Sequence, residues 1–169
     1  MNILMITLRL LHIIAGVFWV GAGLVMFFFI GPTLGATADA GQKFAQHLML
    51  RTRFTAILTI SAILTVLVGA ILYWIDSDGF SSAWTHSGPG LGFGLGAGFG
   101  LLGLIFGIMV GNSNSALAKL GLQIKGKPTP EQMDQIGALR KRLSVVSPLN
   151  AYSLLIATLL MAIARYLRF

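Results

Sequence analysis

Cysteine is absent from this chain of 169 residues, which excludes disulfide bonds, thiolate zinc sites, iron–sulfur clusters and the covalent attachment of c-type haem. Charge is also scarce, because only 10% of the residues are charged, whereas an average soluble domain has about 25%. Hydrophobic residues make up 56% of the chain. This composition excludes an intrinsically disordered chain, which needs low hydrophobicity and high charge, and it predicts an integral membrane protein.

Four apolar segments are each long enough to cross a bilayer as a helix, which takes about 20 residues. They cover residues 3–30, 54–75, 91–110 and 145–166. We expect helices rather than strands, because a helix satisfies its own backbone hydrogen bonds in hydrocarbon. The sequence therefore predicts an all-α, integral membrane bundle of four transmembrane helices. It forms a single domain over residues 1–169, with loops at 31–53 and 111–144.

Lysine and arginine are unequally distributed between the segments that connect the spans. Of the twelve basic residues, three lie in the loop at 31–53, six lie in the loop at 111–144, and none lies between the second and third spans. The positive-inside rule then places both basic loops in the cytoplasm and both termini in the periplasm of a bacterial inner membrane. Because nine of the twelve basic residues lie in these loops between apolar spans, where the positive-inside rule explains them, nucleic acid is not expected as a partner.

Ionisable side chains inside a membrane span are candidates for function, because burying an arginine costs at least about 2.5–3.5 kcal/mol on insertion scales. The five acidic residues all lie outside the spans, so a carrier with an intramembrane carboxylate is not expected. The first span holds two ionisable residues, Arg9 and His12. They are three residues apart and share a helix face, which Gly16 and Trp19 continue.

This face can be interpreted as a haem site, since a neutral histidine can ligate haem b iron through one ring nitrogen. In that hypothesis His12 is the metal ligand and Arg9 pairs with a propionate. Gly16 leaves room for the planar ring, Trp19 stacks on it, and His86, in the loop on the same side, is a candidate second axial ligand. The alternative is structural: His12 is hydrogen-bonded to a backbone carbonyl or a hydroxyl of another helix, and Arg9 is merely interfacial.

The first span also resembles a known group of proteins. Residues 9–12 (RLLH), followed by residues 19–21 (WVG), are similar to the opening helix of small bacterial membrane proteins that include the copper-resistance D-like, DUF2269-type and HemJ-type protoporphyrinogen oxidase families. Residues 50–54 (LRTRF), followed by an apolar span with Gly69, resemble their second helix. Residues 161–166 (MAIARY) resemble the ending of some copper-resistance D-like chains.

The resemblance implies a four-helix bundle and, in the HemJ-like case, His12 as a haem b ligand. HemJ-like chains carry a lysine at the start of the third helix, and residues 85–90 of this chain contain none. Their acidic entry to the fourth helix is also replaced, by residues 144–148 (SVVSP). The resemblance therefore supports a redox or electron-transfer role with haem b more than the oxidase activity itself.

Glycine recurs at every fourth residue in the third span, which lets helix backbones approach closely. This spacing predicts either packing within the bundle or a docking surface, for a second copy or for a larger membrane complex of the respiratory type. The second functional hypothesis is therefore a non-catalytic subunit. The candidate docking glycines are Gly92, Gly96, Gly100, Gly103, Gly107 and Gly111, and a further row is Gly90, Gly94 and Gly98.

A third hypothesis is copper handling, because thioethers bind Cu(I). Met1 and Met5 lie one helical turn apart, with His12 deeper in the same helix. The other methionines are scattered along the chain, and we expect them to fill irregular gaps in the packing.

Polar residues mark the cytoplasmic ends of the third and fourth spans. Asn112 and Asn114 either cap the third helix or form a polar pocket with Asn150, Tyr152 and the arginines of the first loop. Before the fourth span, residues 129–131 (TPE) predict the start of a separate cytoplasmic helix, since threonine caps a helix and proline and glutamate suit its first turn. That helix is predicted to end at residues 140–142 (RKR).

The predicted topology can be tested with reporter fusions. A reporter fused in the loop at 112–144 should be active only as a cytoplasmic reporter, because that loop carries six basic residues. A reporter fused near Asp78 should be active only as a periplasmic reporter. A periplasmic location for the loop at 112–144 would contradict the predicted orientation.

Overall fold

The computed structural model describes residues 3–168, and every regular element in that range is a helix. Four stretches are long and apolar enough to span a membrane: Ile3–Ala36, Phe54–Asp76, Gly88–Gln123 and Pro130–Tyr166. The prediction of an all-α fold with four helical stretches that are long and apolar enough to span a membrane is therefore confirmed. The elements are α1 (Ile3–Val25), the π-helical turn η1 (Met26–Ile30), α2 (Gly31–Ala36), α3 (Ala38–Arg51), α4 (Phe54–Asp76), α5 (Ser82–Thr85), α6 (Gly88–Gln123), α7 (Pro130–Ile163) and the 3₁₀ turn η2 (Ala164–Tyr166).

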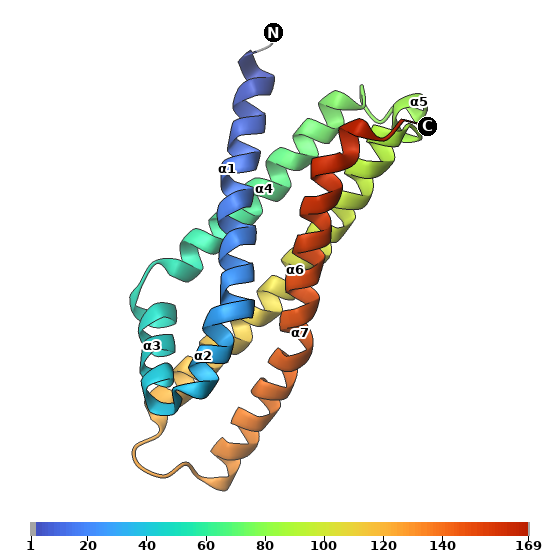
Figure 1. Cartoon of the computed structure of the whole chain (residues 1–169). Coiled ribbons are helices and arrows are strands. Elements are labelled where there is room, and N and C mark those ends of the chain that lie inside the picture. The colour runs from blue at the N-terminus through green and yellow to red at the C-terminus, as the bar shows by residue number, and fades with distance from the viewer. Residues whose placement is uncertain (1–2, 169) are drawn as a thin grey trace.

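The long helices form two packed pairs, α1 with α4 and α6 with α7 (Figure 1). The pairs meet where α4 and α3 contact α6 and where α1 contacts α7. Both ends of the chain lie at the end of the bundle that carries α5, which we call the α5 end (Figure 1). The opposite end, which carries α2, α3 and the connection at residues 124–129, is called the α3 end.

The helices extend well beyond the predicted spans. The predicted span at 91–110 lies within α6, which continues to Gln123, so the prediction that Asn112 and Asn114 cap its end is wrong. The predicted span at 145–166 lies within α7, which begins at Pro130 and contains Pro148. A separate helix that ends at residues 140–142 is therefore also wrong. Hydropathy marks where apolar sequence ends, whereas a helix continues through polar residues of good helix propensity.

The start of α7 agrees with the sequence prediction. Thr129 accepts a hydrogen bond from the backbone N–H of Gln132 at 3.2 Å, and the Gln132 side chain accepts one from the N–H of Thr129 at 2.9 Å. This is a capping box, which satisfies two backbone donors that the helix leaves unpaired. Hydrogen bonds from the backbone of Glu131 and from the Thr129 side chain lower the pKa of the exposed Glu131 carboxyl.

The closest helix contact joins α6 to α7 along one row of glycines. A Cβ atom at these positions would meet atoms of α7 or of the following turn η2 at about the distance of direct contact or less. The pairs are Gly92 with Ala164 of η2, and Gly96 with Met161, Gly103 with Leu154 and Gly107 with Asn150 of α7. Asn150 also donates a hydrogen bond from Nδ2 to the Gly103 carbonyl at 2.7 Å. Close packing and interhelical hydrogen bonds are what hold helices together in lipid.

Replacing Gly103 with leucine should force α6 and α7 apart, because a Cβ atom at this position would lie 2.5 Å from Leu154 Cδ2. We expect the free energy of unfolding to fall by about 1–3 kcal/mol, the usual cost of overpacking. Thermal unfolding in detergent, followed by circular dichroism, measures the effect. The matched control is Gly98→Leu, since nothing lies within 4 Å of a Cβ atom there. Equal melting temperatures for the two variants would contradict the proposed packing.

Candidate functional site

His12 on α1 is anchored to the neighbouring helix α4. Its Nδ1 lies 2.8 Å from the backbone carbonyl oxygen of Thr65. A carbonyl oxygen only accepts hydrogen bonds, so Nδ1 carries the proton and Nε2 of the neutral ring keeps its lone pair. This contact is the one that the structural alternative predicts, a histidine hydrogen-bonded to a backbone carbonyl of another helix.

Gly69 makes room for the His12 ring. A Cβ atom at residue 69 would lie 2.8 Å from His12 Cε1 and 3.1 Å from Nδ1. Gly69 follows Thr65 by one helical turn, so the carbonyl and the space for the ring lie on the same face of α4. Gly16 packs against this face too, with Thr65 Cγ2 at 3.5 Å from where a Cβ atom would be. Sequence reasoning missed Thr65 and noted Gly69 only through the resemblance.

Arg9 pairs with an acidic residue of its own chain. Its guanidinium lies 3.3 Å from a carboxylate oxygen of Asp76, the last residue of α4. The two side chains are 50% and 31% exposed, and exposed pairs contribute about 0–1 kcal/mol. The ion pair therefore joins α1 to α4 at the α5 end without a large contribution to stability. The sequence suggested this arginine as a partner for a propionate and gave no indication of Asp76.

Trp19 lies two helical turns beyond His12 and belongs to the core. It is 6% exposed and clusters with Ala62 and Leu154. The Trp19 side chain packs between α1, α4 and α7, whereas the sequence suggested that it stacks on a cofactor beside His12. The four residues predicted to form one haem-binding face of α1 therefore have different roles. His12 is anchored to α4, Arg9 forms an ion pair, Gly16 packs against α4, and Trp19 belongs to the core.

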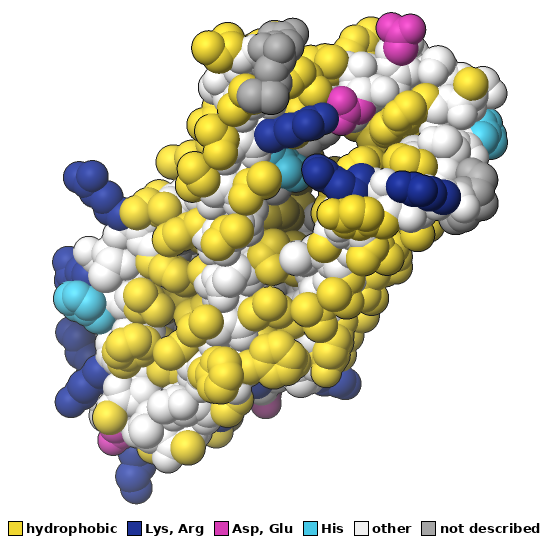
Figure 2. All heavy atoms as spheres, turned by 45° about the horizontal axis from the view of Figure 1, so that its top comes forward, with side chains coloured by type: hydrophobic (Ala, Val, Ile, Leu, Met, Phe, Trp, Pro, Cys, Tyr) yellow, Lys and Arg dark blue, Asp and Glu magenta, His cyan; other side chains and the backbone are white. Residues whose placement is uncertain are grey.

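His86 lies at the C-terminal end of α5, and its Nδ1 contacts the Ser82 carbonyl at 2.8 Å. The short helix α5 packs against α6. Figure 2 shows the histidine side chains well separated from one another on the face that it draws. The structure therefore does not bring His86 and His12 together as a pair of axial ligands.

The structure brings together only part of the residues that were suggested for copper binding and for docking. No group of three or more His, Asp or Glu side chains that could hold a metal ion occurs within residues 3–168, and Met1 of the suggested copper ligands lies outside the described residues. Four of the six candidate docking glycines face α7 or η2 inside the chain, which leaves two with open space beside them, Gly100 and Gly111.

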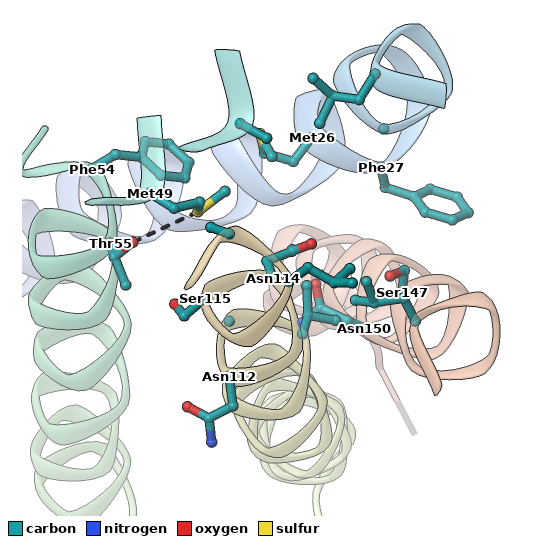
Figure 3. A pocket seen from close by; sticks show the side chains of 18 of the residues that line it. Met26, Phe27, Met49, Phe54, Thr55, Asn112, Asn114, Ser115, Ser147 and Asn150 are labelled. Atoms are coloured by element: carbon teal, nitrogen blue, oxygen red, sulfur yellow. Dashed lines mark hydrogen bonds between the residues drawn. The ribbon is translucent and has the colours of Figure 1, made fainter. Parts of the chain in front are cut away.

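A large cavity lies at the α3 end, between α1, α3, α4, α6 and α7, with a volume of about 1060 Å³. Asn114, Ser147 and Asn150 lie on its α6 and α7 side, with Met26 and Met49 across from them (Figure 3). The three asparagines of the predicted polar pocket all line this cavity, but Tyr152 and the arginines of the first loop do not, and the arginine that does is Arg140. The sequence analysis placed Arg140 at the end of a separate helix and so did not predict that it lines this cavity.

The fit between Gly69 and the His12 ring can be tested with a double-mutant cycle. Gly69→Ala should lower the free energy of unfolding by about 1–3 kcal/mol, because the new methyl group overlaps the ring. In a His12→Ala background the same change should cost much less, since the ring is gone. Gly21→Ala is the control, because a Cβ atom at residue 21 meets nothing within 4 Å. Additive effects of the two substitutions, measured by thermal unfolding, would contradict direct contact.

Comparison with known proteins identifies no relative of this chain. No family model matches the sequence, and neither does any curated protein or solved structure. The functional interpretation therefore depends on the geometry around His12 and on the cavity at the α3 end.

Proposed function

We propose that this membrane protein binds haem b through Nε2 of His12 and serves in electron transfer. The observation that supports the proposal is the hydrogen bond from His12 Nδ1 to the Thr65 carbonyl at 2.8 Å. A histidine that ligates a metal almost always donates its other ring N–H to a carbonyl, a carboxylate or water, which fixes the tautomer and the ring orientation. His12 is held in that way, with Nε2 left as the atom that can bind iron.

The residues around His12 fit such a group in three respects. The ring is partly buried and held against Gly69, so its orientation is set before any ligand binds. Arg9 is exposed, and its pairing with Asp76 is weak enough to be exchanged for a propionate. Arg165 and Arg168, near the C-terminus, lie at the same end of the bundle as Arg9 (Figure 1), where Figure 2 shows a hollow beside a histidine and bordered by basic side chains.

The protein's own residues would then do three things. His12, with its tautomer fixed, would hold the iron through Nε2. The basic side chains at the α5 end would balance the propionate charges, and the apolar faces of α1 and α4 would exclude water. A bound haem supplies a one-electron couple, whose potential the axial ligand and the burial of the group adjust. This role needs no further nucleophile or acid–base pair in the chain.

A non-catalytic subunit remains the second candidate, and one observation favours it. Gly100, one of the predicted docking glycines, lies on α6 with nothing within 4 Å of where its Cβ atom would be. Its backbone is therefore open to close approach by another helix, in contrast to the glycines that are already covered inside the chain.

The haem proposal predicts a clear difference between histidine variants. The wild-type protein, purified in detergent from haem-replete cells, should show a Soret band and, after dithionite reduction, the α band of haem b. His12→Ala should lose both bands, because it removes the iron ligand. His47→Ala is the matched control, since His47 is exposed on α3 at the other end of the bundle, and it should keep the wild-type spectrum. A His12→Ala protein that keeps the full spectrum would refute the assignment.

A further inference from the structure

The cavity at the α3 end is amphipathic in its lining. Hydrogen-bonding side chains come from α3, α4, α6 and α7, and they include Asn114, Ser147 and Asn150. Apolar side chains alternate with them on all sides, and they include Trp19, Phe27 and Leu58 towards α1 and α4. With about 1060 Å³, the cavity is as large as the upper end of typical ligand pockets, which measure roughly 300–1,000 Å³.

Asn150 brings an unsatisfied acceptor to this cavity. The residue is only 8% exposed, and its Nδ2 donates to the Gly103 carbonyl. Because a carbonyl accepts only, this bond fixes the amide orientation, and Oδ1 is the atom that remains. Within residues 3–168 no group donates a hydrogen bond to Oδ1. Every buried side-chain nitrogen or oxygen within residues 3–168 has a hydrogen-bond partner, so the unpaired Oδ1 is not sealed in the core but opens to the cavity that Asn150 lines. There it is available to accept a hydrogen bond from a ligand.

The charges around the cavity indicate an uncharged partner. Its lining holds two charged side chains, Asp39 and Arg140, which have opposite signs and are exposed. Amides and hydroxyls supply the rest of the polar lining, so the two charges cancel and the lining as a whole has no excess of either sign to select a charged head group. The wall at the α1 side includes Met26 and Phe27 of the π-helical turn, and such turns occur often at functional sites.

We propose that this cavity binds an uncharged, membrane-soluble amphipathic molecule whose head group carries a hydroxyl group. The hydroxyl donates a hydrogen bond to Asn150 Oδ1, and the apolar lining side chains, such as Trp19 and Leu58, hold the ring or chain. Two sources share this chemistry, a quinol and a neutral lipid with a free hydroxyl. The site lies at the opposite end of the bundle from His12 and stands independently of haem binding.

The test is to measure what the purified protein carries. Wild-type protein and variants are purified in mild detergent from native membranes, extracted with organic solvent, and analysed by mass spectrometry for neutral lipids, quinones and phospholipids per chain. Asn150→Leu removes the acceptor. Gly111→Leu fills the cavity, because Gly111 lines it and a Cβ atom there meets nothing within 4 Å. Gly98→Leu is the matched control, with the same open space but outside the cavity.

We expect about one uncharged amphipathic molecule per chain in the wild type and in Gly98→Leu. In Gly111→Leu and Asn150→Leu the amount should fall about tenfold, as expected when a hydrogen bond or the ligand's space is lost. Oxidation of the extract in air converts a quinol to its quinone, and borohydride then reverses the change in the ultraviolet spectrum. A hydroxyl-bearing lipid shows neither change, which distinguishes the two sources. Gly111→Leu adds no clash, so it remains informative if Asn150→Leu does not fold.

Two results would overturn the proposal. One is an extract that holds only charged phospholipids, or no lipid above the micelle background, in the wild type. The other is an equal amount of the neutral molecule in Gly98→Leu and Gly111→Leu. The absorbance of haem is recorded on the same samples as a separate readout, so failure of this site and failure of the His12 site are distinguishable.

Discussion

The close approach of α6 to α7 is the contact on which the rest of the bundle depends. Helices in lipid gain little from the hydrophobic effect, so they associate through close packing and interhelical hydrogen bonds. Along this seam glycines on α6 face side chains of α7, and Asn150 donates to the Gly103 carbonyl. The second pair, α1 with α4, is joined by the His12 bond to Thr65 and by the Arg9–Asp76 ion pair. The cavity lies where the two pairs meet at the α3 end.

The two candidate sites are built in the same way. In each, a polar side chain on one helix donates a hydrogen bond to a backbone carbonyl of its neighbour, and a glycine on that neighbour makes the space. The donation fixes the orientation of the side chain and leaves one acceptor atom, Nε2 of His12 or Oδ1 of Asn150. An acceptor held in this way is ready to bind a ligand without further ordering, which lowers the entropic cost of binding.

The sequence predicted the four spans and singled out His12 and Arg9, because ionisable groups are conspicuous in apolar sequence. It did not predict Thr65 or Asp76 as their partners, since the pairing depends on how α1 and α4 lie against each other. The glycine rows were visible, but α7 and η2 cover positions 92, 96, 103 and 107 and leave Gly100 uncovered. Which glycines are covered depends on how the two helices pack along each other, and a strict four-residue repeat in the sequence does not predict it. The helix ends were missed because hydropathy reports on the bilayer and not on backbone hydrogen bonding.

The central claim, that an anchored imidazole on α1 ligates haem, is tested most directly by the haem content of the wild-type protein. A pyridine haemochrome assay on protein purified from haem-replete cells gives the identity of the haem and its ratio to the chain. The account predicts haem b at about one per chain, with a reducible iron. A colourless protein at full chain concentration would contradict it, and the His12 hydrogen bond would then serve only to join α1 to α4.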